Sequence, residues 1–272
     1  NYLMDLKGFV SAIRIENCVI SIFGVLVGFI LSSGYFEFSN KLLLLLVSVF
    51  AITGAGNAIN DFFDADIDKR LGRKKQEGKT SYWLSLSLFT IGIFLSAFVN
   101  FHAIIIASVS SLALIIYAGL LQKFKYVGNW LISILTAFTI FYGATLNGSY
   151  GLVFFPALSA FFANGAREII KDLEDLKGDK GYKITLPMLV GIEKIKKIVF
   201  FIFLFSIVCA FLAFYNMKNQ IIYLSGFLVT VSLLYFSYQD LLKNNFSNSR
   251  KLVKFAMVSA LLSFILGSLI VL

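Results

Sequence analysis

Charged side chains are scarce in this sequence. Lys, Arg, Asp and Glu make up 14% of the 272 residues, whereas 58% of the residues are hydrophobic. A soluble domain carries about 25% charged residues. The shortage therefore excludes an ordinary soluble globular protein and indicates a chain that crosses a membrane several times.

Residues that mark other folds and other kinds of site are also rare. Pro156 and Pro187 are the two prolines, and the alternating segments of about ten residues that build a membrane β-barrel are absent. Cys18 and Cys209 both lie in apolar runs, which excludes a disulfide framework and a Cys-x-x-Cys metal site. His102, the one histidine, lies in a short loop, where we expect a structural role. The first apolar run is too long for a cleavable signal peptide, so we expect none.

Long apolar runs are what the sequence has in abundance. They are continuous and about 20 residues long, which is the length of a helix that spans a bilayer. We therefore predict an all-α membrane protein, a single domain over residues 1–272, with about nine transmembrane helices in one bundle. The mixed stretch 1–17 is expected to form a short interfacial helix. The predicted spans are 18–36, 42–60, 82–99, 103–121, 130–146, 152–170, 198–215, 221–238 and 253–272.

The loops between these spans differ in charge. If residues 1–17 and the loops after the second, fourth, sixth and eighth spans share one side, that side holds every Lys and Arg except Lys41 and Lys218. It also holds every Asp and Glu except Glu37. The positive-inside rule makes this side cytoplasmic. We therefore expect a multi-pass protein of the cell membrane, with a cytoplasmic N-terminus, the C-terminus outside and a site that opens to the cytoplasm.

Two of the cytoplasmic loops begin with the same acidic pattern, Asp-x-x-Asp-x-x-x-Asp. It covers residues 61–68 after the second span and residues 172–179 after the sixth. On a helix the three carboxylates fall within an arc of roughly 60°. Like charges so close repel one another, so a cation is needed, and oxygen ligands favour Mg²⁺ over Zn²⁺. The predicted metal ligands are Asn60, Asp61, Asp64, Asp68, Asp172, Asp175 and Asp179.

Two acidic faces that each hold Mg²⁺ suit a diphosphate, because its charges must be neutralised before it can leave a carbon atom. We expect two Mg²⁺ ions, with Asp64, Asp68, Asp175 and Asp179 as the catalytic carboxylates. The alternative is that both segments are solvated loops without a ligand. Lys123 and Lys125 lie in the short loop after the fourth span, and both are candidates for contacts to the diphosphate. The predicted substrate-binding residues are Asn57, Asn60, Arg167, Lys171, Lys123, Arg14, Asn17 and Tyr117.

The wording of both acidic stretches resembles the signatures of the UbiA superfamily of intramembrane prenyltransferases. The first reads Gly-Asn-Ala-Ile-Asn-Asp over residues 56–61, and the second follows Arg-Glu-Ile-Ile-Lys-Asp over residues 167–172. Both are most similar to the archaeal branch, which makes the ether-lipid precursor digeranylgeranylglyceryl phosphate. Relatives usually continue with Asn-Arg-Pro-x-Arg-Pro, whereas residues 70–78 contain no proline here.

The resemblance implies a reaction as well as a fold. Two Mg²⁺ would bridge an isoprenyl diphosphate, with geranylgeranyl diphosphate as donor and the free hydroxyl of geranylgeranylglyceryl phosphate as acceptor. One alternative is an aromatic acceptor, as in quinone biosynthesis. Another is an ion-coupled transporter, although transporters place ion sites near the membrane midplane and these acids lie at the ends of spans. The expected partners are the diphosphate donor, a lipid-phosphate acceptor and membrane lipids, and no nucleic acid.

Overall fold

The computed structural model describes residues 6–70, 78–179 and 181–269, without the side chains at 6, 7, 66–70 and 177. These residues form helices and no strand, apart from one parallel bridge between Phe124 and Ile184. The all-α prediction is therefore confirmed. The helices are α1 (Leu6–Ile13), α2 (Ile15–Ser33), α3 (Asn40–Arg70), α4 (Gly78–Ala97), α5 (Phe101–Gly119), α6 (Lys125–Ala144), α7 (Tyr150–Glu174), α8 (Leu176–Asp179), α9 (Leu186–Val190), α10 (Ile192–Ala213), α11 (Gln220–Leu242) and α12 (Phe246–Leu269), with 3₁₀ turns at Leu121–Lys123 and Phe214–Asn216.

Each predicted span overlaps one long helix, but the helices differ in hydropathy. Within the described residues, 8 helices are long and apolar enough to cross a membrane. The predicted span 152–170 is the exception, because α7 is long enough at 25 residues but carries too many polar groups to count among them. The lower hydropathy of α7 has a physical reason, because its polar side chains Asn164, Arg167, Glu168 and Lys171 line the cavity inside the bundle. Residues 1–17 contain the short helix α1, as predicted.

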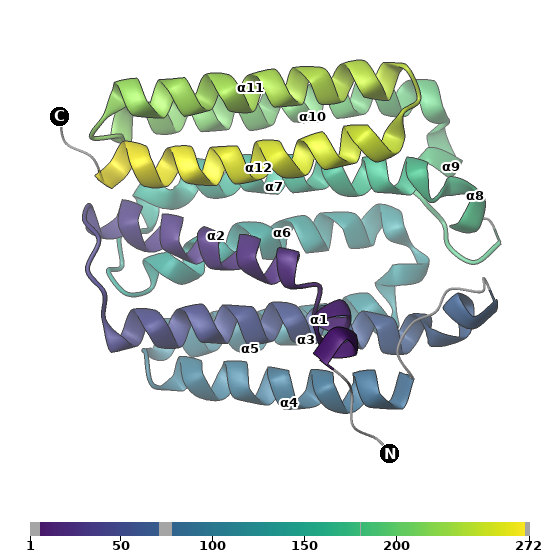
Figure 1. Cartoon of the computed structure of the whole chain (residues 1–272), viewed down its shortest axis with the longest axis horizontal. Coiled ribbons are helices and arrows are strands. Elements are labelled where there is room, and N and C mark those ends of the chain that lie inside the picture. The colour runs from purple at the N-terminus through teal and green to yellow at the C-terminus, as the bar shows by residue number, and fades with distance from the viewer. Residues whose placement is uncertain (1–5, 71–77, 180, 270–272) are drawn as a thin grey trace.

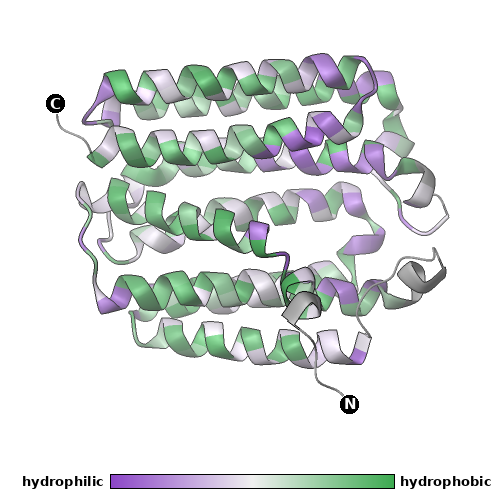
Figure 2. Cartoon of the chain, in the orientation of Figure 1, coloured by the Kyte–Doolittle hydropathy of each residue, from purple (hydrophilic) through white to green (hydrophobic). Residues whose placement is uncertain are grey.

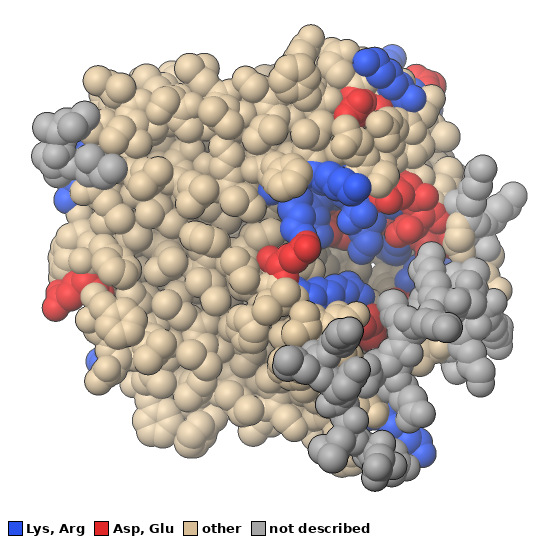
Figure 3. All heavy atoms as spheres, in the orientation of Figure 1, with Lys and Arg blue, Asp and Glu red and all other residues tan. Residues whose placement is uncertain are grey.

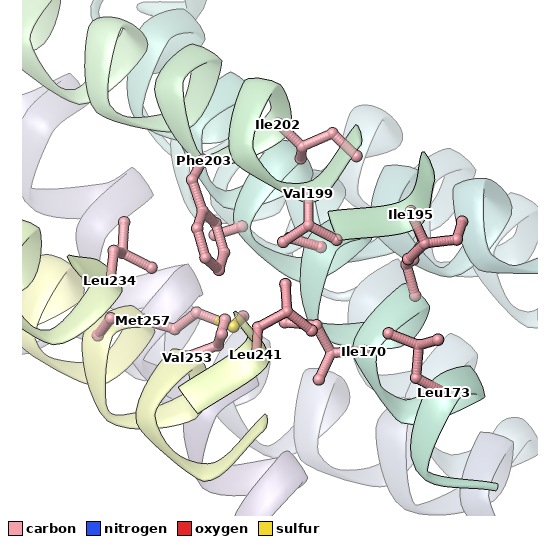
Figure 4. Packing of buried hydrophobic residues seen from close by; sticks show 14 residues of the cluster. Ile170, Leu173, Ile195, Val199, Ile202, Phe203, Leu234, Leu241, Val253 and Met257 are labelled. Atoms are coloured by element: carbon pink, nitrogen blue, oxygen red, sulfur yellow. The ribbon is translucent and has the colours of Figure 1, made fainter. Parts of the chain in front are cut away.

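The long helices run side by side along the bundle (Figure 1). Helix α7 packs against α6, α10 and α12, while α3 packs against α2, α4 and α5. Figure 4 shows the apolar core where α7, α10, α11 and α12 meet, with Ile170, Val199, Leu241 and Val253 close together at its centre. Because lipid tails are themselves apolar, close van der Waals contact of this kind holds helices together in a membrane.

Hydrophilic residues are not spread evenly over the bundle. In Figure 2 they gather toward the end that carries α8 and α9, and the middle of the long helices is mostly hydrophobic. Helix α3 continues past its apolar part to Arg70 and therefore carries the first acidic pattern to this end. Helix α7 ends at Glu174, so the second pattern starts on α7 and continues into α8. Both acidic patterns thus lie at one end of the bundle.

Helices α2 and α6 touch through their backbones. A Cβ atom added to Gly28 would lie 1.8 Å from the carbonyl oxygen of Ile140, and one added to Gly143 would lie 2.0 Å from that of Val25. Such close approach is possible only where both helices present glycine. The contact fixes α2 against α6, and both helices line the cavity described below.

We expect Gly143→Ala to destabilise the protein by about 1–3 kcal/mol, because the new methyl group overlaps the α2 backbone. Gly151→Ala is the matched control, since a Cβ atom at Gly151 meets nothing within 4 Å. The fraction of each variant that stays monodisperse after heating in detergent measures the difference. Equal heat resistance of the two variants would contradict the tight α2–α6 contact.

Candidate active site

A cavity of about 400 Å³ lies inside the bundle, between α2, α3, α5, α6, α7, α10, α11 and α12. Its lining changes along each helix. On α3 it passes from Asp64 and Asn60 to Ile52 and Val49, several turns farther from the polar end. Helix α7 shows the same gradient, and the inner part is lined largely by aliphatic and aromatic side chains. The charged and amide side chains of the lining are Arg14, Asn17, Asn57, Asn60, Gln122, Lys125, Asp64, Asn164, Arg167, Glu168, Lys171, Asp175, Asp179 and Lys183.

Most residues predicted to form the site line this cavity, and Tyr117 does so too. Lys123 does not: it is exposed, and the lining includes Lys125 in its place. Asp61 and Asp172 are buried beside the cavity in ion pairs. Asp68 belongs to α3, but its side chain lies outside the described residues. The structure therefore brings Asp64, Asp175 and Asp179 to the cavity, and it holds the first aspartate of each pattern, Asp61 and Asp172, in ion pairs beside it.

The first acidic pattern is held by contacts from two distant segments. Lys183 Nζ lies 3.1 Å from Asp64 Oδ1, and Asn60 Nδ2 donates to Asp64 Oδ2 at 3.1 Å. Asp61 accepts a hydrogen bond from Arg14 Nη2 at 2.8 Å. Since Lys183 follows α8, the Lys183–Asp64 pair joins the two acidic segments across the cavity mouth.

Arg14 lies at a strained joint between α1 and α2. Its φ of 50° falls in the left-handed region, which costs a non-glycine residue of order 1–3 kcal/mol. Asn57 Nδ2 donates to the carbonyl oxygen of Ile13 at 2.7 Å and holds the joint in place. The ion pair to Asp61 and this amide contact offset the strain and keep the guanidinium at the cavity wall.

The second acidic pattern is held mainly by Lys125. Its Nζ lies 2.7 Å from Asp179 Oδ2 and 3.2 Å from Asp172 Oδ1. Asn129 Nδ2 donates to Asp172 Oδ2 at 2.7 Å, which satisfies the other oxygen of a side chain that is only 1% exposed. Both acidic patterns are therefore neutralised in part by lysines from outside the patterns.

A third group of charges lies on the α7 wall. Glu168 is buried between Arg167, whose Nη2 is 3.3 Å from Oε1, and Lys171, whose Nζ is 3.6 Å from Oε2. Arg167 Nη1 also donates to Asn164 Oδ1 at 2.8 Å. Figure 3 shows Lys and Arg side chains gathered with Asp and Glu around a hollow on one face of the molecule. The α7 wall thus supplies cations that are separate from those paired with the acidic patterns.

The oxygen atoms that line the cavity mouth are of the type that a hard cation prefers as ligands. Asp64, Asp175, Asp179 and Asn60 offer only oxygen ligands, which Mg²⁺ prefers. Within the described part of the chain, no three His, Cys, Asp or Glu side chains already form a cluster that would hold a metal ion. The carboxylates are instead shared with Lys125 and Lys183, so a bound divalent cation would replace lysine contacts at an oxygen-lined site.

Several lining residues escaped the sequence analysis. Glu168 lies four residues before Asp172 and Lys183 lies four residues after Asp179, so the helical spacing of the second pattern extends one step in each direction. Extending the pattern would have found both. Asn164 carries no such signal, because a single amide in an apolar helix is as often a packing group.

We expect Lys125→Met to destabilise the protein by roughly 3 kcal/mol, because it leaves the buried Asp172 without its cation. Lys123→Met is the matched control: Lys123 is exposed and should change stability by no more than about 0.5 kcal/mol. Equilibrium unfolding in SDS compares the two. Adding Asp172→Asn to Lys125→Met should restore part of the lost stability, because the uncompensated buried charge is removed. Equal stability of Lys125→Met and Lys123→Met would contradict the buried ion pair.

Comparison with known proteins agrees with this geometry. Residues 21–268 match the UbiA prenyltransferase family. A digeranylgeranylglyceryl phosphate synthase of Thermococcus kodakarensis is 35% identical, over 98% of this chain and 100% of its own length. A relative of the same name from Methanococcoides burtonii is 37% identical, over 97% of this chain and 100% of its own.

Solved structures share the fold. One, described as "Structural and mechanistic insights into the biosynthesis of Digeranylgeranylglyceryl phosphate synthase in membranes", has a TM-score of 0.79 at 30% identity and covers 97% of this chain and 98% of that one. A UbiA homolog from Archaeoglobus fulgidus bound to GPP and Mg²⁺ has a TM-score of 0.66 at 15% identity, over 93% of this chain and 99% of that chain. At that identity the likeness concerns the fold alone.

The resemblance read from the two acidic patterns is therefore confirmed along nearly the whole sequence. The same comparisons favour prenyl transfer over ion-coupled transport. With a family match over residues 21–268 and relatives above 30% identity over almost their full length, this chain belongs to the UbiA prenyltransferase family.

Proposed function

We propose that this enzyme transfers a geranylgeranyl group from its diphosphate to the free hydroxyl of geranylgeranylglyceryl phosphate. The observation that carries the proposal is the presence of two separate charged groups in one cavity. Carboxylates and two lysines line the mouth, whereas Arg167 and Lys171 flank Glu168 on the adjoining wall, and Arg14, which is paired with Asp61, lines the same cavity. A reaction between a diphosphate and a second phosphorylated lipid needs two such groups. The names of the relatives support the same substrates.

The donor diphosphate is assigned to the acidic mouth. Asn60, Asp64 and Asp68 on one side and Asp175 and Asp179 on the other would hold two Mg²⁺, which neutralise the charge of the departing diphosphate. Lys125 and Lys183 lie among these carboxylates and add positive charge beside the phosphate oxygens. Asp61 and Asp172 act indirectly here, by holding Arg14 and Lys125 in place.

The inner cavity is assigned to the prenyl chain and the reacting carbon. Its wall includes Phe138, Phe227 and Phe264, and this lining keeps water away from an allylic carbon that gains cation character. The bond from this carbon to the diphosphate oxygen breaks, and the acceptor hydroxyl oxygen forms the new ether bond. The hydroxyl proton passes to the released diphosphate, which becomes more basic as it leaves.

The acceptor phosphate is assigned to Arg14, Arg167 and Lys171, with Asn17 beside them in the lining. Arg167 and Lys171 are four residues apart on α7 and therefore share one face of the helix, so a phosphate could contact both. Asp61 and Glu168 neutralise part of this positive charge, so the wall offers several charged hydrogen-bond donors around a small net charge. A phosphate has three free oxygens to accept from these donors and an aromatic carboxylate has two, which favours the lipid-phosphate acceptor over the quinone-type alternative.

The orientation follows from charge placement. The polar end of the bundle faces the cytoplasm in this proposal, because the described Lys and Arg residues lie at that end apart from Lys41 and Lys218. Lys218 Nζ contacts the carbonyl oxygen of Gly34, so it belongs to the opposite end together with the loop after α2. We accordingly place the protein in the cell membrane, with donor and acceptor phosphates approaching from the cytoplasm.

Sealed inverted membrane vesicles test the reaction and its sidedness together. With labelled geranylgeranyl diphosphate outside, product should form on geranylgeranylglyceryl phosphate and not on 4-hydroxybenzoate. EDTA, which does not cross the membrane, should abolish the reaction in inverted vesicles. Transfer to 4-hydroxybenzoate alone would assign the enzyme to the aromatic branch, and a full rate in EDTA would refute the metal requirement.

The two acidic patterns should act as one unit on the same diphosphate. Asp64→Asn and Asp175→Asn remove charge with little change of shape, and each should lower kcat at least roughly 100-fold, while the double variant should lose far less than the product. Asp240→Asn is the control, because Asp240 does not line the cavity and should keep the wild-type rate. Multiplicative losses in single-turnover assays would mean that the patterns serve two independent sites.

A further inference from the structure

Asn164, a residue of the cavity wall, has a hydrogen-bond donor without a partner. The residue lines the cavity wall and is only 1% exposed. Its Nδ2 has no hydrogen-bond partner among the described residues. Leaving a buried donor unsatisfied costs about 1–3 kcal/mol. Such a group takes its partner from outside the described residues, either from a water molecule in the cavity or from a ligand that displaces it.

The orientation of this amide is fixed by its neighbour. Arg167 Nη1 donates to Asn164 Oδ1 at 2.8 Å. An arginine can only donate, so turning the amide over would set two donors against each other. The carbonyl oxygen therefore faces Arg167, and the amide nitrogen is left with both of its hydrogens for other partners.

The position of Asn164 on α7 shows which part of a ligand would meet it. Asn164 precedes Glu168 by four residues and Lys171 by seven, so all three share one face of the helix. At about 1.5 Å per residue, Asn164 lies roughly 5–10 Å farther into the cavity than those two side chains. Beyond it the α7 lining contains Ala163, Ala160, Ser159 and Pro156 and no charged residue. Asn164 thus marks the boundary between the charged wall and the uncharged interior.

A glycerol ether has a matching boundary. Its phosphate is followed within a few bonds by uncharged oxygens and then by the hydrocarbon chain. An ether oxygen can only accept a hydrogen bond, and it loses its water partner on entering the cavity. The attacking hydroxyl is a poorer match, since donation to it would withdraw the electron density that forms the new bond.

We propose that Asn164 determines acceptor specificity by donating a hydrogen bond from Nδ2 to the ether oxygen of the acceptor's glycerol. This inference rests on the proposed function and adds a contact that recognises the ether link itself. Arg167 has two roles in this arrangement, because it orients the amide and lies beside the acceptor phosphate. A lipid phosphate that lacks the ether oxygen would leave the Asn164 donor unpaired.

The test compares two acceptors, geranylgeranylglyceryl phosphate and an analogue with a methylene group in place of the ether oxygen. We expect the wild type to prefer the ether by roughly tenfold in kcat/KM, mainly through KM. Asn164→Leu and Asn164→Asp both lack the donor and should bring this ratio close to one. Asn164→Asp keeps an oxygen for Arg167, so it separates the lost donor from a disturbed arginine.

The control is Ser110→Ala, which removes another polar group from the cavity lining and should keep the wild-type preference. An ether preference that survives in Asn164→Asp would overturn the inference, since it would leave Asn164 only the structural role of holding Arg167. A wild type that transfers the prenyl group equally to both acceptors would overturn it too. A wild type that uses neither acceptor would refute the proposed function itself, and the inference with it.

Discussion

Neutralising negative charge at one end of the bundle is the constraint on which the rest of the structure depends. The two acidic patterns bring six aspartates to that end, and like charges so close would drive the helices apart. Cations from other segments form ion pairs with these aspartates: Arg14 with Asp61, Lys183 with Asp64, and Lys125 with Asp172 and Asp179. These contacts join the α1–α2 joint, α3, α6, α7, α8 and the loop after α8 around one cavity. The same charges that prepare the site for a diphosphate therefore also organise the fold.

Much of this arrangement could be predicted from the sequence, because it depends on periodicity. The apolar runs gave the long helices, and the repeated spacing of carboxylates placed both patterns at the same end of the bundle. Helix α7 was harder to predict, since its polar residues point into the bundle. Hydropathy alone does not show whether such residues form an inward polar face of a long helix or mark the end of a shorter span. The gradient from Lys171 through Asn164 to the alanines becomes visible only once the helix has a defined inner face.

Other parts could not be predicted, since they depend on tertiary contacts between distant segments. The spacing in the sequence gives no reason to distinguish the three aspartates of each pattern. In the structure, however, Asp61 and Asp172 form ion pairs with cations from other segments. Whether Lys123 or Lys125 lines the cavity depends on the orientation of the 3₁₀ turn Leu121–Lys123. The periodicity of an α-helix does not continue through this turn, so it could not predict the answer. Asn164 could not be singled out for a related reason, because only the structure shows that its buried Nδ2 has no hydrogen-bond partner among the described residues.

The single backbone bridge between Phe124 and Ile184 has a consequence for how the mouth meets a ligand. The N–H of Ile184 donates to the carbonyl oxygen of Lys123 at 2.8 Å, which links the loop before α6 to the loop after α8. Lys125 and Lys183 each lie within two residues of this link. The spacing of their backbones is therefore set by this link, and the ion pairs with Asp179 and Asp64 hold the two ammonium groups in place. The conformational entropy of arranging two charges is largely lost during folding, so less of it remains to oppose the binding of a multiply charged anion.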